Sequence, residues 1–570
     1  MGNFLKTQNM FAFGEISPDF YAKDNILGVA HLENMDILQS GGVKRRAGLK
    51  TIGSAASESI LIPFPVSETQ KYLVVVYNGT IDIYHNDTIV RTLISPWTTE
   101  DLKHLQYAQR FNKLFFVHPN YPPRILTRTD NNFTLNQFQF DVNTDVSINI
   151  PCMRLEETKG ISFTITNSNI DNNHAVFTAS ADYFTNQSVG QRINAISKQW
   201  VVESVQNARV ATVYTNGNFV FPDNPVYDWS ESVFSDRRGW PACITFHQNR
   251  LIFARTPTVP NGIWMSKTGD YYNFSVGTGL DDDAIYTTLL SAQHHQIYTL
   301  VSSDNLQILT SVGEWAVSGS PLTPSSVDVK KHTSVGSNIT RYLPPQQIEG
   351  STVFISKSGK DIRELDLDAL SEHYNATDLC SFSKHLMSNP VSMAYNSMLH
   401  RLFVVMADGE MAVLNKHPNT DIAAWGRYIT DGNFKYVCVL EDTVYVIVQR
   451  KSSCYLEKFD DTCLKDAGNY GFSYKISGLP MLVKGHYPKK IRVYKISVRV
   501  MNTKSIFINN NRIEIPDTVF TQDHPGYCGD LSVNVLGTYQ NTMQSLWSIS
   551  SSEQLPATIL SVNVDGWYQI

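Results

Sequence analysis

The pattern of apolar and polar positions predicts short antiparallel strands along most of the chain. Residues 71–84 (KYLVVVYNGTIDIY) are the clearest hairpin, because Asn78-Gly79 joins two β-rich runs and is a dipeptide typical of two-residue hairpin turns. Residues 111–123 (FNKLFFVHPNYPP) predict another strand, which we expect to stop at the prolines. This rhythm is typical of antiparallel sheets and not of helices.

The stretch from Trp240 to Trp315 has the same rhythm. Apolar residues on both sides of Gln248-Asn249 predict a strand there. Residues 263–266 (IWMS) predict a second short strand, ended by the turn residues 268–270. Residues 297–315 then predict a strand, a polar turn, a second strand and a break at a glycine.

Further hairpins continue the series toward the end of the chain. They are predicted at residues 352–367 with a turn at 358–360, at residues 400–414 with a turn at 407–409, and at residues 435–459 around Glu441-Asp442. Without residues 130–223, successive hairpins lie about 40 to 50 residues apart, which is near the period of propeller blades. No WD or kelch signature is present, so the pattern leaves the number of blades open.

Two other parts of the chain do not follow the hairpin series. Residues 130–223 are rich in Asn, Thr and Ser with alternating runs, and residues 471–570 contain the strictly alternating IRVYKISVRV. We therefore predict an all-β protein, with a β-propeller-like body of repeated antiparallel hairpins, an inserted β-rich domain and a C-terminal β domain. The predicted parts are an N-terminal arm (1–50), a first propeller part (51–129), the insert (130–223), a second propeller part (224–470) and the C-terminal domain (471–570).

The net charge, the cysteines and the apolar runs argue against several classes of protein. The 570 residues carry a net charge of −6, which argues against a global basic field that would hold nucleic acid. Residues 471–570 hold nine basic and six acidic residues, a balance of +3, which leaves −9 for the rest of the chain. Seven cysteines without a CxxC argue against a disulfide framework or a zinc ribbon. The first ten residues have no apolar core of a signal peptide, and no apolar run reaches about 18 residues, so no membrane span is expected.

Motifs that carry chemistry are absent from the sequence. It has no Walker A loop, no HExxH and no GxSxG. The tightest acidic cluster is Asp281-Asp282-Asp283, but neighbours on an extended strand point to alternate faces and would not share a metal. A propeller glycosidase needs two carboxylates across a cleft, and the sequence does not pair Asp270 or Glu314 with a second acid. We therefore expect no catalytic residue, no metal site and no cofactor.

Several motifs are similar to one known family. The series PACITFHQNRLIFA, GIWMSKTGDYYNF, DDDAI, ILTSVGEWAVSG and LTPSS resembles the tail nozzle (tail tubular protein B) family of short-tailed phages. The opening GEISP, the later GGVKRRAG and the ending LPATIL extend the resemblance to both ends of the chain. Ala47 stands where the family often has proline. The matching segments span most of the chain except residues 130–223.

The resemblance implies a structural virion protein that is not an enzyme. Six copies would form a ring-shaped tail nozzle that closes the tail tip, contacts the tail adaptor ring protein, and conducts genomic DNA into the host during ejection. Tail fibres or spikes are further implied partners, and assembly would take place in the host cytoplasm. Two alternatives from other classes stay open, a propeller glycosidase and a receptor- or fibre-binding tail protein that uses residues 130–223.

The resemblance also points to two sets of candidate residues. The N-terminal segment is either an arm that docks on a neighbour or a surface arm with solvated basic residues, and its assembly candidates are Gly14, Glu15, Ser17, Pro18, Lys44, Arg45 and Arg46. A basic channel wall would hold passing DNA, because each neutralised phosphate adds affinity. An acidic or neutral wall is therefore expected, unless these acids only solubilise the outer surface. The channel candidates are Asp281, Asp282, Asp283 and Glu314.

Overall fold

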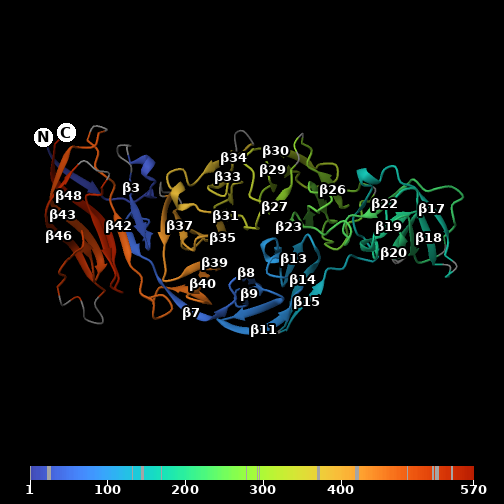
Figure 1. Cartoon of the computed structure of the whole chain (residues 1–570), viewed down its shortest axis with the longest axis horizontal. Helices are drawn as coiled ribbons and strands as arrows, with labels where there is room; N and C mark the ends of the chain where they lie inside the picture. The colour runs from blue at the N-terminus through green and yellow to red at the C-terminus, as the bar shows by residue number, and fades with distance from the viewer. Residues whose placement is uncertain are drawn as a thin grey trace. The chain divides into compact units, whose positions relative to one another are not determined.

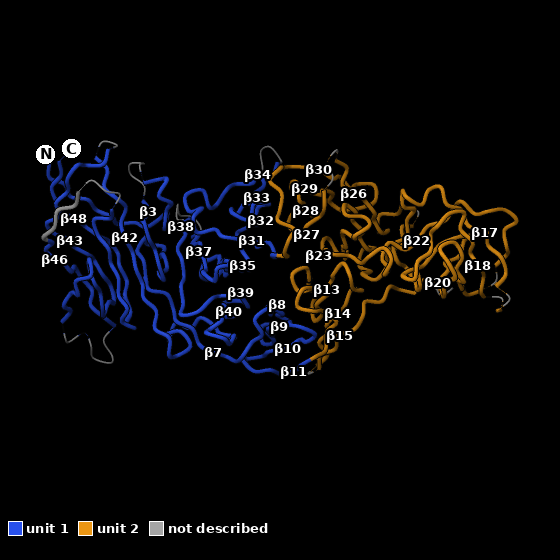
Figure 2. Tube along the Cα trace, viewed as in Figure 1, with its two compact units in different colours: residues 1–92, 343–570 blue, residues 93–342 orange. Residues whose placement is uncertain are grey.

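The regular structure of the described chain consists of β-strands and a few short helical turns, and the chain divides into two compact units (Figures 1 and 2). The first unit comprises residues 1–92 and 343–570, and the second comprises residues 93–342. The computed structural model describes residues 2–21, 27–130, 132–142, 147–168, 170–171, 173–217, 219–277, 279–291, 293, 295–368, 373–417, 423–483, 486–516, 519, 525–540 (backbone only for 536–540) and 544–569. The helices in these ranges are single 3-10 turns: η1 (Pro18–Phe20), η2 (Asp101–Lys103), η3 (Glu156–Thr158), η4 (Asn186–Ser188) and η5 (Lys384–Leu386).

The second unit contains three antiparallel sheets of four consecutive strands, which we call meanders. Their strands are β12 (Gln106–Arg110), β13 (Lys113–His118), β14 (Tyr121–Thr129) and β15 (Asn132–Gln137); β23 (Cys243–His247), β24 (Arg250–Ala254), β25 (Gly262–Met265) and β26 (Ile285–Thr288); and β27 (Ile297–Ser302), β28 (Leu306–Thr310), β29 (Gly313–Ser318) and β30 (Asp328–Lys331). The first strand of each meander contacts the first strand of the next, β12 against β23 and β23 against β27. Four-stranded sheets packed in this way are typical of propeller blades.

The first unit contains four meanders of the same kind. Their strands are β8 (Ile60–Pro65), β9 (Lys71–Tyr77), β10 (Thr80–His85) and β11 (Thr88–Ile94); β31 (Gln346–Ile348), β32 (Ser351–Ile355), β33 (Ile362–Asp368) and β34 (His373–Asp378); β35 (Pro390–Asn396), β36 (Arg401–Met406), β37 (Met411–Lys416) and β38 (Ala423–Tyr428); and β39 (Asn433–Leu440), β40 (Thr443–Arg450), β41 (Ser453–Asp460) and β7 (Gly48–Ala55). First strands again contact in series, β31, β35, β39 and β8. The all-β, propeller-like body is therefore confirmed.

The meander of β39, β40 and β41 obtains its fourth strand from the other end of the chain. β7 pairs antiparallel with β41, with Leu49 opposite Phe459 and Gly48 opposite Asp460. The sequence pattern predicted a boundary at residue 50 and placed residues 51–129 in the first propeller part. The structure differs because β41 has a free edge that the N-terminal segment pairs with, a long-range pairing that local pattern does not reveal.

Most predicted hairpins are confirmed, and two details are corrected. Asn78-Gly79 joins β9 and β10, and the turn residue Gly79 has φ 72°. Gln248-Asn249 is not inside a strand, because both residues have positive φ (43° and 57°) and form the hairpin turn between β23 and β24. Pro122 and Pro123 do not stop the sheet, since they lie at the start of β14, beside a register shift where missing N–H donors are tolerated.

The insert is a seven-stranded sheet of the second unit, with the order β16-β22-β19-β20-β21-β18-β17. Its strands are β16 (Cys152–Met153), β17 (Phe163–Asn167), β18 (His174–Ala179), β19 (Arg192–Ala195), β20 (Lys198–Asn207), β21 (Val210–Tyr214) and β22 (Trp229–Ser232). Buried aromatic residues, including Phe163, Phe177 and Trp200, form its core. The insert begins and ends later than residues 130–223, because β15 still pairs with β14 and because β22 pairs with β16 and β19.

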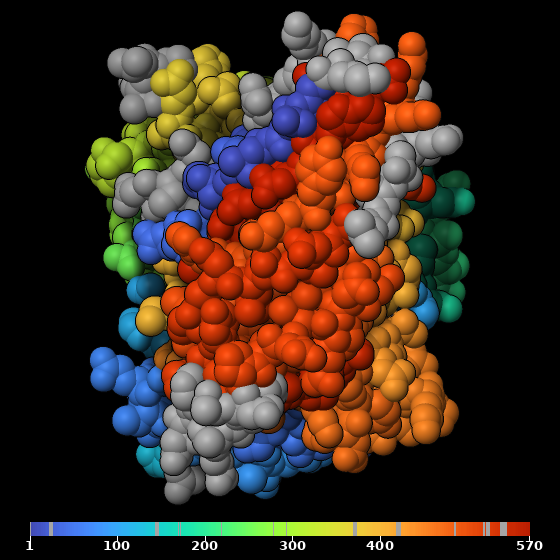
Figure 3. Space-filling model, turned by 90° about the vertical axis from the view of Figure 1, so that its left-hand side faces the viewer, coloured from blue at the N-terminus to red at the C-terminus, as the bar shows by residue number. Residues whose placement is uncertain are grey.

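The described residues of the segment 2–47 are not a peripheral arm but join two sheets of the first unit, and residues 48–50 begin β7 in a third. One sheet contains β1 (Gly2–Gln8), β5 (Met35–Ile37), β6 (Val43–Arg45), β43 (Lys490–Thr503), β46 (Tyr527–Gln540) and β48 (Thr558–Gln569). In Figure 3 the blue residues of β1 run beside the red residues of β48. The other sheet extends β38 through β2 (Gly14–Glu15), β3 (Gly28–Val29), β4 (His31–Glu33), β42 (Tyr474–Ser477), β47 (Ser548–Ser551), β44 (Phe507–Ile508) and β45 (Asn511–Arg512).

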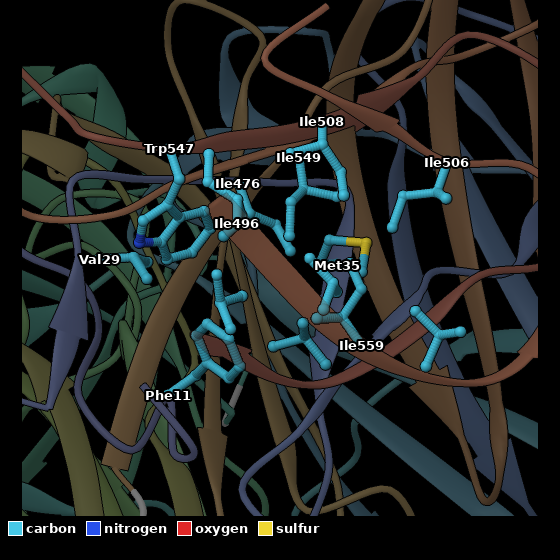
Figure 4. Close-up of a cluster of buried hydrophobic side chains, with 14 of the residues drawn as sticks. Phe11, Val29, Met35, Ile476, Ile496, Ile506, Ile508, Trp547, Ile549 and Ile559 are labelled. Atoms are coloured by element: carbon cyan, nitrogen blue, oxygen red, sulfur yellow. The ribbon is translucent and has the colours of Figure 1, made fainter. Parts of the chain in front are cut away.

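A single hydrophobic cluster joins the N-terminal and C-terminal segments (Figure 4). Phe11, Val29 and Met35 from the first fifty residues pack with Ile476, Trp547 and other residues from the end of the chain. All of these side chains are almost fully buried. The C-terminal β domain therefore does not have a core of its own, since part of that core comes from residues 1–50.

Deleting residues 1–48 should prevent the first unit from folding, contrary to the expectation from sequence that a folded body would remain. Each large buried apolar side chain contributes about 1.5–3 kcal/mol, and a domain is stable by only roughly 5–15 kcal/mol. We expect little soluble protein and loss of the main thermal unfolding transition measured by circular dichroism. The control deletion, residues 1–8, removes only the edge strand β1 and should keep a cooperative transition. A melting curve for the longer deletion equal to that of the full chain would contradict the prediction.

Candidate functional site

The seven assembly candidates lie in the first unit, and most of them are not accessible. Pro18 and Lys44 are exposed, whereas Gly14, Glu15, Ser17, Arg45 and Arg46 are buried. The buried five bind other parts of the same chain, as the following contacts show. A direct contact with a neighbouring subunit therefore stays a prediction for Pro18 and Lys44 only.

Arg46 and Asp466 form a fully buried ion pair at the start of β7. The two guanidinium nitrogens Nη1 and Nη2 lie 2.9 and 2.8 Å from the two carboxylate oxygens. Arg46 also donates from Nε to Asn34 Oδ1 at 2.8 Å and lies over the ring of Phe472, 3.6 Å from its centroid. The exposed fractions of the two side chains are 0% and 1%. Both terminal nitrogens of the Arg46 guanidinium bind Asp466 within the same chain, so this arginine has a structural role.

Arg45 is buried beside Arg46 without a carboxylate partner in the described residues. Its guanidinium donates to the carbonyls of Phe472, Leu464 and Leu555 at 2.9, 3.2 and 3.2 Å, and to Gln554 Oε1 at 2.7 Å. Burial, followed by the nearby charge of Arg46, lowers the pKa of Arg45 to about 10. The cluster that sequence analysis read as a basic surface patch is therefore mainly an internal anchor, and only Lys44 faces solvent.

Glu15 is the centre of a second buried network in the same segment. It accepts hydrogen bonds from the Leu32 N–H at 2.8 Å and from Arg427, and His385 Nε2 lies 2.9 Å from its Oε1. Burial by itself would raise the pKa of Glu15, but the bonds from His385 and Arg427 lower it to about 2. The carboxylate is therefore ionised at neutral pH and ties β2 to β38 and to the segment around η5.

Gly14 and Ser17 position this network through their backbones. Gly14 has φ +62°, and a Cβ on it would meet the carbonyl oxygen of Trp425 at 2.1 Å, so only glycine allows β2 to approach β38. The Ser17 N–H donates to the carbonyl of Phe382 at 2.7 Å. The GEISP motif is thus explained by packing within the chain.

The DDD motif in the second unit contains one internal and two exposed carboxylates. Asp281 and Asp282 are exposed, whereas Asp283 is buried and accepts hydrogen bonds from Lys267 Nζ and from the Gly279 and Leu280 N–H groups at 2.8, 3.1 and 3.0 Å. The bond from Lys267, followed by the backbone N–H groups, lowers the pKa of Asp283. Only the first two carboxylates are therefore available to line a channel.

Arg250 holds this loop in place, a role that sequence analysis did not identify. It is fully buried and donates to the carbonyls of Ser266, Asp281 and Asp283 at 2.7, 2.9 and 2.6 Å. The available signal was an arginine inside the apolar run RLIFA, where a buried charge needs several acceptors. The exposed carboxylates of Asp281 and Asp282 therefore lie on a loop whose backbone is held by hydrogen bonds from the buried Arg250.

Glu314 is also internal, so it does not line an accessible surface. The exposed fraction of its side chain is 1%, and it accepts hydrogen bonds from the Thr333 hydroxyl and from the Gly336 N–H at 2.9 Å. Burial raises the pKa of Glu314, because desolvation outweighs these bonds. The side chain braces the backbone that follows β30, and the channel expectation is kept only for Asp281 and Asp282.

The described residues do not present the geometry of a glycosidase site at the acids named from sequence. Desolvation, followed by the neighbouring carboxyl group of Asp270, raises the pKa of Asp141. Carboxyl pairs of glycosidases are separated by about 5 Å or more, which leaves room for the substrate, and Glu314 is enclosed. No group of three His, Cys, Asp or Glu side chains suited to a metal occurs in the part of the chain that the structure describes.

The described ranges also contain no helix with the length and apolar character needed to cross a membrane. All seven cysteines are free thiols, and Cys243, Cys380, Cys438 and Cys454 are buried. This agrees with the sequence-based argument against a disulfide framework.

Replacing Glu15 with glutamine should destabilise the first unit in a pH-dependent way. The folded pKa of about 2 lies below the ordinary value of 4.5, so the stabilisation by the carboxylate is complete above pH 4.5 and is lost as the pH falls toward 2. The shift corresponds to on the order of 3 kcal/mol. The thermal midpoint of Glu15→Gln should therefore lie well below that of the wild type at pH 7, and the gap should narrow by pH 3.

The matched control is Asp530→Asn, which makes the same change in the exposed Arg499–Asp530 pair. It should leave the thermal midpoint nearly unchanged at both pH values, because exposed pairs contribute little. A pH-independent gap for Glu15→Gln would show that the ionised carboxylate is not the stabilising species.

Part of the chain is similar to a known protein family. No curated protein sequence matches the chain. Solved structures that overlap it include BamB from Moraxella catarrhalis (9% identity, 73% of this chain and 98% of that chain, TM-score 0.34) and the β-propeller domain of Cps50 (Swd1) from Myceliophteria thermophila (7% identity, 72% and 99%, TM-score 0.37). TM-scores this low do not establish a shared fold.

A match to a family model covers the centre of the chain. Residues 242–511 match the model of the bacteriophage nozzle protein. The matched region begins at β23, contains the DDD loop and Glu314, and extends into the sheets that the N-terminal segment joins. On this match the resemblance seen in the sequence is confirmed for the centre of the chain, where residues 242–511 are similar to the bacteriophage nozzle protein family.

Proposed function

We propose that this chain is a subunit of a ring-shaped tail nozzle, with six copies per ring, that closes the tail tip and conducts genomic DNA during ejection. The observation that carries the proposal is the family match over residues 242–511. The same residues hold a loop with exposed carboxylates whose backbone carbonyls accept hydrogen bonds from Arg250. Among the acids named from sequence, they hold no catalytic arrangement. The chain acts through its surfaces, and its copies meet head to tail so that the rotation closes.

The charge of the chain suits a conduit better than a DNA-holding protein. A basic wall binds duplex DNA through its phosphates and would slow its passage. Asp281 and Asp282 are exposed, and Arg250 fixes the carbonyl of Asp281 from below. A loop of this kind can present negative charge toward passing DNA without collapsing onto it. We therefore assign these two residues to the channel wall.

Electron cryo-microscopy of virions, with mass spectrometry of the same particles, tests the ring. We expect a sixfold ring at the tail tip whose density fits the two compact units. The adaptor ring protein should lie above it, and any tail fibres or spikes should attach around it. Particles that contain the chain but show it as a monomer, or in a ring of another symmetry, would overturn the proposal.

Reversing the charge of the proposed wall should slow ejection. In Asp281→Lys/Asp282→Lys, each added lysine creates a phosphate contact, so we expect DNA release from virions to slow by about tenfold, with a delay that shrinks at high salt. Release is measured by the fluorescence of a DNA dye after receptor triggering. The isolated wild-type chain should bind duplex DNA no more tightly than about 10⁻⁴ M at physiological salt.

The matched control is Glu156→Lys/Asp182→Lys, which makes the same charge change at exposed acids of the insert (84% and 73% exposed). It should eject at the wild-type rate. Equal slowing in both variants would mean that total charge, and not position on the wall, sets the rate.

A further inference from the structure

The strand β11, at the outer edge of the sheet β11-β10-β9-β8, exposes apolar side chains and carries a single charged residue. β11 (TIVRTLI) ends the order β11-β10-β9-β8 and has no buried residue. Ile89 and Val90 are 52% and 48% exposed. Since successive side chains of a strand point to opposite faces, apolar groups are exposed on both faces of the edge. Free edges of this kind are templates for pairing with another chain.

Other outer strands of the meanders show how this fold protects an edge. β15 (NFTLNQ), β30 (DVKK) and β34 (HYNATD) end their sheets, and their exposed positions carry polar or charged residues. β15 and β34 also bury one aromatic residue each, Phe133 and Tyr374. The exposed apolar side chains of β11 are therefore specific to this strand and are not required by the blade architecture.

A groove in the first unit lies beside one face of β11. It has a volume of about 630 Å³ and runs between Gly53, Ser54 and Ala55 of β7 and the side chains of Val75, Tyr77 and Ile89. A Cβ on Gly53 would have a single neighbour within 4 Å, the Tyr84 hydroxyl at 3.9 Å, so this wall is open. A strand added to β11 would direct alternate side chains over this groove, next to Ile89.

The charge on β11 argues for a different protein rather than a second copy. Arg91 is the one charged residue of the strand, it is exposed, and it lies at the centre. Symmetric antiparallel pairing of two β11 strands would place Arg91 opposite Arg91, and like charges directly opposite are destabilising. The edge strands β15, β30 and β34 have no aliphatic side chain at an exposed position that could pair with β11.

We propose that the free edge of β11 binds an extended segment of a different tail protein as an added β-strand. The segment places an apolar side chain in the groove beside Ile89 and an acidic side chain opposite Arg91. Main-chain hydrogen bonds supply affinity in this mode of recognition, and the side-chain pockets supply specificity. The inference rests on membership of a phage tail and not on the ring or the DNA conduit.

Site-specific photo-crosslinking in assembled virions tests the proposal. A benzophenone amino acid replaces Val90 in the full chain, and the control replaces the exposed Asn375 on β34. We expect crosslinking at position 90 to one other virion protein. Mass spectrometry should map the crosslink to a segment of alternating apolar residues that includes an acidic one. Detecting the chain in the same virions separates failure of strand docking from failure of the tail assignment.

Charge substitutions at Arg91 supply the second measurement. Arg91→Glu replaces attraction by repulsion, so the yield of the crosslink should fall about fivefold to tenfold, whereas Arg91→Lys should retain it. Because Arg91 is exposed, both variants should melt at the wild-type temperature. Crosslinking no greater than at position 375, crosslinking to another copy of this chain, or equal yields for the two variants would overturn the proposal.

Discussion

The buried pair of Arg46 and Asp466 is the interaction on which the first unit depends. It joins the residue before β7 to the loop after β41, two positions separated by 420 residues of sequence. Taking both charges out of water is costly, and the bidentate geometry with Asn34 and Thr430 offsets this cost. Removing one partner would leave an uncompensated buried charge, at a cost of about 3–5 kcal/mol. The position of β7 as the fourth strand beside β41 is thereby strongly specified.

The same anchoring explains why the first fifty residues serve several sheets at once. From one short segment, β2 to β4 extend the sheet of β38, β5 and β6 enter the C-terminal sheet, and β7 completes a meander. The Glu15 network and the hydrophobic cluster around Phe11 and Trp547 also join the N-terminal segment to later parts of the chain. The first unit therefore cannot form its core until both ends of the chain have come together. This is a high cost in loop-closure entropy, which the buried contacts must offset.

In the proposed nozzle, the buried contacts of each unit support its exposed loops and edges. Arg250 beneath the Asp281-Asp282 loop shows the principle, because a buried side chain fixes a backbone whose acids face solvent. β11 shows the opposite case, an edge with exposed apolar side chains, whereas the exposed positions of β15, β30 and β34 are polar or charged. The two surfaces that we propose to act are a loop with exposed carboxylates and a strand edge with exposed apolar side chains. In both, side chains that could be paired or buried within the chain face solvent instead.

The sequence by itself determined the class of fold and the positions of most hairpins. Signals such as Asn78-Gly79 and the alternation in IRVYKISVRV are local, because a turn or a strand face depends on neighbours within a few residues. The motifs that resemble the nozzle family are also local and could be identified from the sequence. The tertiary structure alone decided which charged side chains are buried, because their partners are distant in sequence. The basic cluster at Arg45 and Arg46 proved internal, and Glu15, Asp283 and Glu314 became buried acceptors. An isolated charged residue has the same appearance in a sequence whether it faces water or a partner hundreds of residues away, and only the folded chain supplies that partner.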